Sequence, residues 1–326
     1  MFDTTAFLRA IDMHENIVIA GHVNPDGDAV GACFAMALFA ASRGKKPVLL
    51  LGTYAPQYDC LRGREFLWRG NWADVPCDLF IALDCGGKDR LGAAQSIFDR
   101  ADMTVNIDHH ASNDGFAMLN CVDIHKSSAS ELLYTILRGM APVDTEMASA
   151  LFAGIVFDTG GFRHSSATAD TFTVTAELLR LGIDASTLQR KVIYTHSVPA
   201  TRIFSTALAK ARFSANAPIV YTALTHVDMD AAGAKPHDLE RIVDYLLDIE
   251  GAAVSILVSE REGNICKISL RSRKLNVNAI AAQFGGGGHQ KAAGASIVGT
   301  ADEALTAILA ACEEGWKTYE IQNNRH

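Results

Sequence analysis

The 326-residue sequence predicts an α/β protein with two domains: a larger one built on a parallel sheet and a smaller α/β one. The first half alternates short β-branched runs with helical patterns, helices alone follow, and strands return from about residue 213. At about 150 residues per domain, the length also favours two domains. Hydrophobic residues make up 49% and charged residues 20% of the chain, a globular composition that excludes a disordered or collagen-like protein.

The first domain is expected over residues 1–195. Apolar, β-branched runs predict strands at 16–20, 47–51, 79–84 and 103–108, with a helix over 29–43. This alternation is typical of a parallel sheet. Helical patterns with little strand signal between them then follow at 127–137, 145–157, 168–181 and 185–194.

A connector is expected over residues 196–211, because its first part is polar and contains proline. The second domain then covers residues 212–326. Its predicted strands are 219–224, 252–260 and 265–271, and its predicted helices are 239–247, 276–283 and 301–313.

Charge and composition exclude several classes of protein. The net charge of −8 argues against a broad basic surface for long nucleic acid. Between Glu262 and Asp302, however, there are five basic residues and no acidic one, which favours a local site for a small anion. The N-terminus has no signal-peptide pattern, and no apolar run reaches the roughly 18 residues of a membrane span. Seven scattered cysteines without a CxxC pair favour reduced thiols, so we expect a cytoplasmic protein without membrane association.

Acidic and histidine residues follow directly on four predicted elements. They are His22, Asp26 and Asp28 after the first strand, Asp84 at the end of the run 79–84, Asp108, His109 and His110 after 103–107, and Asp158 after the helix 145–157. Ligands of open α/β folds bind at the carboxyl ends of the strands, so we expect these side chains to converge. Helix capping by Asp26 or Asp28 is the alternative interpretation.

Several carboxylates at one edge would repel one another unless cations neutralise them. A mixed set of aspartate and histidine ligands suits Mn²⁺ or a related metal. The pattern therefore predicts a site for two divalent metal ions.

The stretches HVNPDGDAVG, the strand-ending Asp84, Asp108-His109-His110 and GIVFDTGGFRHSSAT resemble the four motifs of the DHH phosphoesterase superfamily. The resemblance implies that one metal is held by His22, Asp26 and Asp84, and the other by Asp28, Asp84, His109 and Asp158. It also implies that Asp108 orients a neighbouring ligand, that His110 contacts the scissile phosphate, and that a water activated by the two metals attacks it. Arg163 is expected to touch substrate phosphate, with a local carboxylate partner as the alternative.

A second glycine-rich motif, GGGGHQKAAG at 285–294, allows positive φ angles and a close approach of backbone N–H groups to a phosphate. Together with the motif Arg-Ser-Arg at 271–273, it resembles the DHHA1 domain. The resemblance implies a cleft between the two domains and a site for the terminal nucleotide. Its candidate residues are Arg271, Ser272, Arg273, Gly286, Gly287, Gly288 and His289, and a solvated surface role is the alternative for Arg273.

Within the superfamily, the length and the paired motifs resemble enzymes that hydrolyse short oligoribonucleotides to nucleoside monophosphates and pAp to AMP and phosphate. The expected partners are therefore short RNA or small nucleotides, and a homodimer is an open alternative to a monomer. A phosphodiesterase for c-di-AMP or the linear dinucleotide pApA is the alternative enzyme. A nucleotide-binding sensor without activity is the alternative outside the enzymes.

Overall fold

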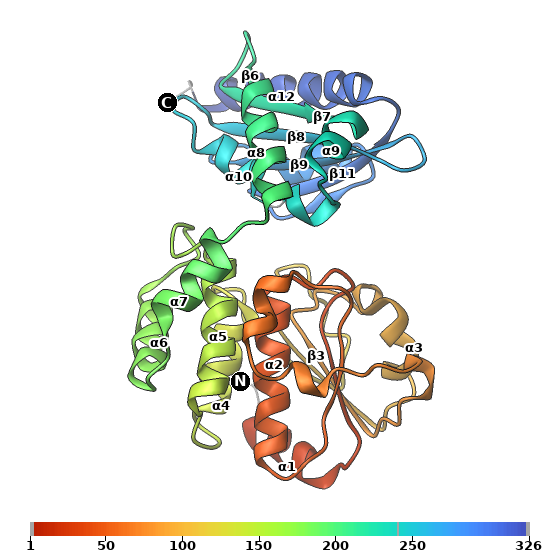
Figure 1. The fold of residues 1–326 in the computed structure, drawn as a ribbon, viewed down its shortest axis with the longest axis vertical. Coiled ribbons are helices and arrows are strands. Elements are labelled where there is room, and N and C mark those ends of the chain that lie inside the picture. Colours follow the sequence, from red (N-terminus) through yellow and green to blue (C-terminus); the bar gives the residue numbers. More distant parts are fainter. Residues whose placement is uncertain (1–2, 240, 324–326) are drawn as a thin grey trace. The chain divides into compact units, whose positions relative to one another are not determined.

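The structure is a computed structural model that describes residues 3–239 and 241–323. The chain divides into two units, residues 1–195 (unit 1) and 196–326 (unit 2) (Figure 1). The mixed α/β fold expected from the sequence is confirmed, and each unit contains its own sheet and its own hydrophobic core.

Unit 1 is built on a parallel sheet with the strand order β2-β1-β3-β4-β5. Its strands are β1 (Ile17–Ala20), β2 (Val48–Leu50), β3 (Leu79–Leu83), β4 (Met103–Asp108) and β5 (Leu119–Val122). All residues of β1 and β3 are buried, as expected for central strands covered on both faces. The parallel sheet is as predicted, and β5 is an additional edge strand.

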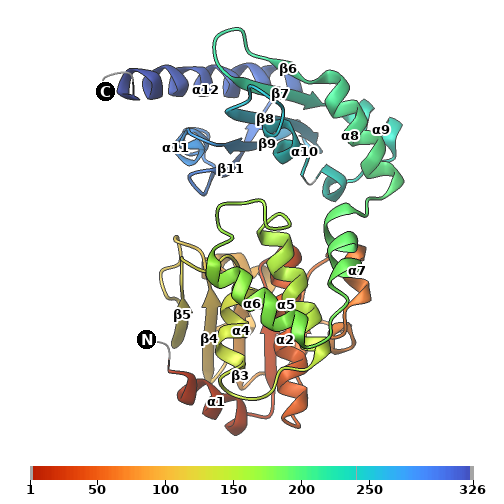
Figure 2. The ribbon, with the colours of Figure 1, turned by 90° about the vertical axis from the view of Figure 1, so that its left-hand side faces the viewer.

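Helices cover both faces of this sheet. The helices of unit 1 are α1 (Thr4–Met13), α2 (Gly27–Ser42), α3 (Gln95–Phe98), α4 (Ala129–Leu137), α5 (Thr145–Asp158), α6 (Ala169–Arg180) and α7 (Ala185–Gln189), with a π-helical turn over Arg190–Tyr194 and 3-10 turns over Pro56–Cys60, Arg64–Phe66, Trp72–Asp74 and Lys88–Ala94. Ile19 and Ile81 face the core that contains α2 and α5, whereas Val18 and Phe80 face the core with Phe98 of α3. Figure 2 shows α4 and α5 in front of β3 and β4.

The helices α2 and α5 approach each other closely at glycine. A Cβ atom added to Gly31 of α2 would lie 2.5 Å from the Ala150 carbonyl oxygen and 3.0 Å from the Gly154 nitrogen of α5. These distances leave no room for a side chain at this crossing. Because α2 begins next to Asp26 and α5 ends at Asp158, the crossing also fixes the distance between two parts of the predicted site.

Unit 2 contains a mixed sheet with the order β10-β11-β9-β8-β7-β6, in which only β7 and β8 are parallel. The strands are β6 (Arg212–Phe213), β7 (Ile219–Leu224), β8 (Val254–Arg261), β9 (Ile265–Ser272), β10 (Gly287–Gly288) and β11 (Ala292–Val298). The helices are α8 (Val198–Lys210), α9 (His226–Ala232), α10 (Ile242–Leu247), α11 (Val277–Ala282) and α12 (Ala301–Asn323), with a 3-10 turn over Pro236–Leu239.

One core of unit 2 lies under α11 and α12, and another lies under α8, α9 and α10. Helix α8 falls in the segment expected to be a connector. It contributes the fully buried Ile203 and Ala207 to the second core, so this segment is part of the fold of unit 2. Helix α12 extends to Asn323, beyond the predicted end at 313, and its later residue Trp316 is buried.

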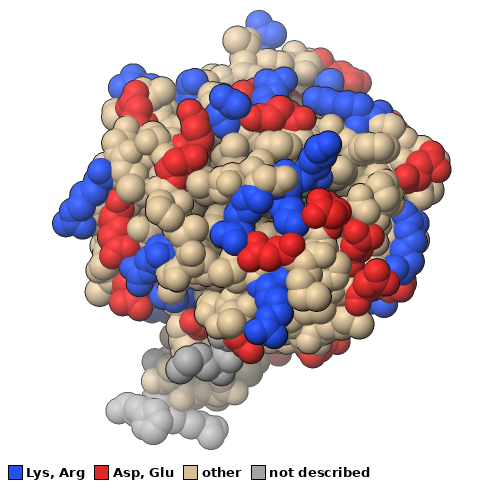
Figure 3. Space-filling view, turned by 90° about the horizontal axis from the view of Figure 1, so that it is seen from below, with Lys and Arg blue, Asp and Glu red and all other residues tan. Residues whose placement is uncertain are grey.

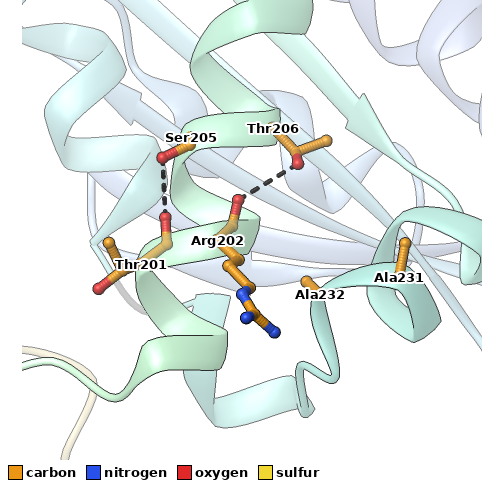
Figure 4. Close-up of a pocket in the computed structure, with 6 residues that line it drawn as sticks. All are labelled: Thr201, Arg202, Ser205, Thr206, Ala231 and Ala232. Carbon is orange, nitrogen blue, oxygen red and sulfur yellow. Dashed lines mark hydrogen bonds between the residues drawn. The ribbon is translucent and has the colours of Figure 1, made fainter.

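A shallow cavity of about 330 Å³ lies between α8 and α9 (Figure 4). Its hydroxyl groups bond back to their own helix: Ser205 Oγ donates to the Thr201 carbonyl oxygen at 2.9 Å, and Thr206 Oγ1 to the Arg202 carbonyl oxygen at 3.2 Å. None of the site residues predicted from the sequence lines it.

On the face shown in Figure 3, basic and acidic side chains are interspersed and do not form an area of one sign. In the part of the chain that the structure describes, no helix combines the length and the apolar character needed to cross a membrane.

Candidate active site

The turn between β1 and α2 positions the first group of predicted residues. Asp26 is the N-cap of α2, and its Oδ1 accepts hydrogen bonds from the backbone N–H groups of Asp28 (2.9 Å) and Ala29 (3.2 Å). Its other oxygen, Oδ2, lies 3.7 Å from Nε2 of His22. Asp26 therefore caps the helix with one oxygen and faces His22 with the other, so the two interpretations of this residue are compatible.

Asp28 lies in the first turn of α2 and is fully buried. Its Oδ2 accepts a hydrogen bond from the Ala129 N–H at 2.6 Å, and its Oδ1 accepts one from the Ser130 N–H at 2.9 Å. Both donors belong to the first turn of α4, where the helix dipole also favours a negative charge. The N-terminus of α4 thus holds the Asp28 carboxylate in a fixed orientation.

Asp84 lies in the centre of the cluster, directly after β3. Its backbone has a φ of 53°, in the left-handed region, and its N–H donates to the Ile107 carbonyl oxygen at 3.1 Å. Its Oδ2 lies 3.6 Å from Nε2 of His22, and its Oδ1 lies 3.6 Å from Nε2 of His109. Asp84 Oδ1 is buried and has no hydrogen-bond partner among the described residues. The two oxygens therefore face two different histidines.

His109 connects the end of β4 with α5. Its Nε2 lies 3.3 Å from Oδ2 of Asp158 and 4.0 Å from Oδ2 of Asp28. Its Nδ1 lies 3.3 Å from the Lys126 carbonyl oxygen. Because a carbonyl oxygen can only accept, Nδ1 donates to it, and Nε2 is the ring nitrogen that faces the carboxylates.

His110 points its Nδ1 at the buried Asp108, with 2.7 Å to Oδ1. Asn113 Nδ2 donates to the other oxygen of Asp108 at 2.7 Å and to Oδ1 of Asn106 at 2.7 Å. Asn113 is missing from the sequence-based prediction. An asparagine, Asn106, within the predicted strand 103–108 is the signal that would have indicated such a network.

The buried carboxylates of the cluster disfavour one another's negative charge. Burial, followed by the charge of Asp84, raises the pKa of Asp28 to about 7, and burial followed by the charge of Asp28 raises the pKa of Asp158. Burial lowers the pKa of His109, but the nearby Asp84 carboxylate and the charges of Asp158 and Asp28 outweigh this effect and raise that pKa to about 11. A divalent cation would remove this repulsion between buried carboxylates.

The donor atoms fit divalent cations. His22, Asp26 and Asp84 form one group, Asp28, His109 and Asp158 a second, and Asp84, His109 and His110 a third, with the ligand atoms of each group within 4.8 Å of one another. Most of the facing atoms are 3.6–4.0 Å apart, which is too long for hydrogen bonds, and His109 Nε2 and Asp158 Oδ2 are 3.3 Å apart. These separations are close to the spacing of about 3 Å between neighbouring ligands in an octahedral shell. The residues present therefore fit divalent metals, and a cavity of about 200 Å³ adjoins His22.

Arg163 lies on the turn that follows α5, five residues beyond Asp158. Gly160, Gly161 and Phe162 all have positive φ in this turn, at 58°, 72° and 68°. The Arg163 N–H donates to the Thr159 carbonyl oxygen at 2.9 Å, and the Arg163 side chain is exposed.

In unit 2 the predicted arginines face carboxylates. Arg271 Nε donates to Oδ1 of Asp244 at 2.7 Å, and Arg273 lies 3.4 Å from Oδ1 of Asp248. Neither aspartate is part of the sequence-based prediction. Ser272 is buried, and its hydroxyl accepts from the N–H groups of Lys274 (3.1 Å) and Leu275 (2.7 Å). Ser272 therefore shapes the turn that presents Arg273.

The glycine-rich motif forms an edge hairpin. Gly287 and Gly288 pair with Gly294 and Ala293 of β11, and a Cβ on Gly286 would lie 2.2 Å from the Gly294 carbonyl oxygen. The hairpin turns at His289, whose N–H donates to the Ala292 carbonyl oxygen at 2.7 Å. The side chain of His289 is exposed, as are Gly287 and Gly288.

The hairpin and the Arg-Ser-Arg motif are adjacent. Ala292 pairs with Arg271 across β11 and β9, and the Ser272 N–H donates to the Lys291 carbonyl oxygen at 2.9 Å. The Lys291 ammonium group in turn donates to the Arg273 carbonyl oxygen. Two motifs separated by about a dozen residues in the sequence thus form one basic surface of unit 2.

Comparisons with known proteins identify a family for each unit. The model of the DHH family, N-terminal domain, matches residues 16–155, and the model of the DHHA1 domain matches residues 216–316. The bifunctional oligoribonuclease and PAP phosphatase NrnA of Thermus thermophilus is 29% identical, with 91% of this chain and 89% of that protein covered. An uncharacterized protein of Mycoplasma pneumoniae is 32% identical, with 86% and 85% covered.

Among solved structures, an exopolyphosphatase-related protein from Bacteroides fragilis superimposes with a TM-score of 0.91 at 26% identity, covering 97% of each chain. The fold is therefore shared along nearly the whole length. The resemblance predicted from the sequence is confirmed: this chain belongs to the DHH family and carries a DHH domain followed by a DHHA1 domain.

Proposed function

We propose that this chain is a metal-dependent phosphoesterase that hydrolyses short oligoribonucleotides to nucleoside monophosphates and pAp to AMP and phosphate. The observation that carries the proposal is the convergence of His22, Asp26, Asp28, Asp84, His109 and Asp158 in a chain that also carries the DHHA1 hairpin. The Thermus thermophilus relative, which is named an oligoribonuclease and PAP phosphatase, supports the choice of substrates.

Two divalent cations, with Mn²⁺ as the proposed metal, would occupy this cluster. His22, Asp26 and Asp84 would hold the first, and Asp28, Asp84, His109 and Asp158 would hold the second. When bound, the cations would activate a water and offset negative charge on the phosphate. The orientation of Asp84, with one oxygen toward His22 and the other toward His109, supports its role as the shared ligand.

Other residues of unit 1 act on the phosphate itself. Burial lowers the pKa of His110, but the hydrogen bond between His110 and Asp108 has the opposite effect. The pKa of His110 is raised overall, which favours the protonated ring. With Nδ1 engaged by Asp108, we assign Nε2 as the donor to a phosphate oxygen. The positively charged side chain of Arg163, on the exposed turn after α5, would contact the same phosphate.

The basic surface of unit 2 would bind the terminal nucleotide. Arg271 donates through Nε to Asp244 and through Nη1 to the Leu270 carbonyl oxygen, which fixes the plane of its guanidinium group. This leaves Nη2 for a phosphate oxygen. Arg273, His289 and the exposed backbone of Gly287 and Gly288 would complete the site. We also propose a cytoplasmic location, which the seven free cysteines support.

The test is a time course of products with Mn²⁺ on four substrates: pAp, a linear RNA dinucleotide, a five-residue RNA and c-di-AMP. Release of mononucleotides from the RNAs together with AMP from pAp is the expected result. Opening of c-di-AMP without cleavage of pAp would instead support the alternative phosphodiesterase. Tight binding of these nucleotides without any product over hours would support the sensor and refute the proposed activity.

A further inference from the structure

The segment Lys126 to Glu131, which leads into α4, contacts two ligands of the second proposed cation. The Lys126 carbonyl oxygen accepts from Nδ1 of His109, and the N–H groups of Ala129 and Ser130 donate to the Asp28 carboxylate. His109 follows β4 and Asp28 begins α2, so they belong to separate elements. The backbone of this segment therefore sets the position of both ligands relative to each other.

Glu131 holds the segment in place. It is fully buried, and its Oε2 accepts from the Ser127 N–H (3.1 Å), the Ser127 hydroxyl (2.6 Å) and the Thr171 hydroxyl (2.8 Å). Its Oε1 lies 3.1 Å from Nζ of Lys126. Thr171 belongs to α6, so Glu131 ties the segment to a second helix as well as to its own start.

Helix capping alone does not account for this arrangement. Ser128 is already the N-cap of α4, with its hydroxyl accepting from the Glu131 N–H at 3.0 Å. A fully buried carboxylate is unfavourable unless it is paired and hydrogen-bonded, and here an ion pair and three hydrogen bonds surround one side chain. The hydrogen bonds and the ion pair of its carboxylate lead to Lys126 and Ser127, which precede α4, and to Thr171 of α6.

We propose that Glu131 is a positioning residue of the metal centre. Through Lys126 and Ser127 it fixes the backbone that orients His109 and Asp28 toward the second cation. The inference rests on the metal ligands of the proposed function. It is specific to that cation, because no hydrogen bond among the described residues joins the segment to His22 or Asp26, the ligands of the first.

The test uses Glu131→Gln, which keeps the size of the side chain but removes its charge and places an amide group among donors. Calorimetric titration of Mn²⁺ into the metal-free full chain measures affinity without any turnover. Two backgrounds separate the sites: His22→Ala retains the ligands of the second cation, and Asp158→Ala retains those of the first. In the His22→Ala background we expect E131Q to weaken Mn²⁺ binding by about 10- to 100-fold, the usual effect of losing a residue that supports a metal ligand. In the Asp158→Ala background we expect no change.

Asp170→Asn is the matched control. Asp170 is the other carboxylate near Lys126, at 3.5 Å from Nζ, but its side chain is 79% exposed. Its removal should leave both affinities unchanged. Thr171→Val, which removes only one donor to Glu131, is the milder variant if E131Q does not fold, and it should weaken the second site selectively.

The outcomes separate the inference from the proposed function. Wild-type protein that takes up no Mn²⁺ would refute the metal site and this inference with it. Wild-type protein with two Mn²⁺ sites, combined with E131Q or T171V variants that bind as tightly as their parents or lose both sites equally, would overturn the role of Glu131 alone.

Discussion

Gly154 lies where α5 passes α4 and the start of α2. Its replacement by alanine tests how closely these helices pack next to the proposed metal ligands. The added Cβ would lie 2.1 Å from Ser130 Oγ, 2.8 Å from Ser130 Cβ and 2.8 Å from Asp28 Oδ1. Rotation of the serine hydroxyl would relieve only the first contact, so the backbone or Asp28 must move. We expect Gly154→Ala to destabilise the protein and to displace a proposed metal ligand.

The magnitude follows from two opposing effects. Overpacking of a core costs about 1–3 kcal/mol, and the better helix propensity of alanine returns up to about 1 kcal/mol. A net loss of about 1–2 kcal/mol lowers the Tm of a unit of this size by roughly 2–8 °C. Mn²⁺ binding should weaken as well, because Asp28 is held between the amides of α4 and the new methyl group.

The assay is thermal unfolding of the metal-free protein, followed by Mn²⁺ titration. Gly139→Ala is the matched control: this exposed glycine follows α4, and its added Cβ would meet only the Ile136 carbonyl oxygen, at 3.6 Å. A Gly154→Ala variant with a Tm within about 1 °C of the wild type and with unchanged Mn²⁺ affinity would refute the reasoning.

Three further predictions concern the site. Asp84→Asn should abolish hydrolysis in the product assay, because each Asp84 oxygen faces a different group of ligands; near-normal turnover would contradict the ligand assignment. Arg271→Ala should raise KM by about 10- to 150-fold with little change in kcat, the factor that corresponds to about 1.5–3 kcal/mol for a charge-assisted contact; a change in Mn²⁺ affinity alone would assign Arg271 another role. The stability of the metal-free protein should fall as the pH rises from about 4 to 7, because the pKa of Asp28 is raised from 3.8 to about 7 and that of Asp158 is raised too, so the folded state binds more protons in this range. The free energy of unfolding should fall by up to about 1.4 kcal/mol per pH unit for each carboxyl. Urea unfolding at several pH values measures this dependence, and an increase in stability over the same range would contradict the prediction.

Much of the fold was predictable because the central strands are short and strongly apolar. β4 was predicted with its observed bounds, whereas β11 was missed, since its sequence AAGASIV is rich in alanine and glycine, which have low strand propensity. Pairing with β9 along its whole length overrides that propensity. Helix α9 was also missed, although Thr225 and Asp228 form a capping box that the sequence contains.

The candidate site was predictable where a residue follows a strand or belongs to a motif. Lys126 and Glu131 were not, because their proposed effect on the candidate metal ligands passes through backbone groups and leaves no spacing pattern. The ion pair of Arg271 with Asp244 joins residues 27 positions apart on β9 and α10 and depends on how the sheet is covered. Such contacts are created by tertiary packing, which local sequence does not report.

The left-handed backbone at position 84 limits which amino acids the position accepts. Besides glycine, asparagine and aspartate are the residues that adopt this conformation most readily. Of these three, only aspartate offers two equivalent carboxylate oxygens to the histidines on either side. A library randomised at this codon should therefore yield glycine, asparagine and aspartate when selected for folded protein, and aspartate alone when selected for hydrolysis. The backbone conformation and the ligand chemistry thus restrict position 84 independently, and aspartate is the residue that satisfies both.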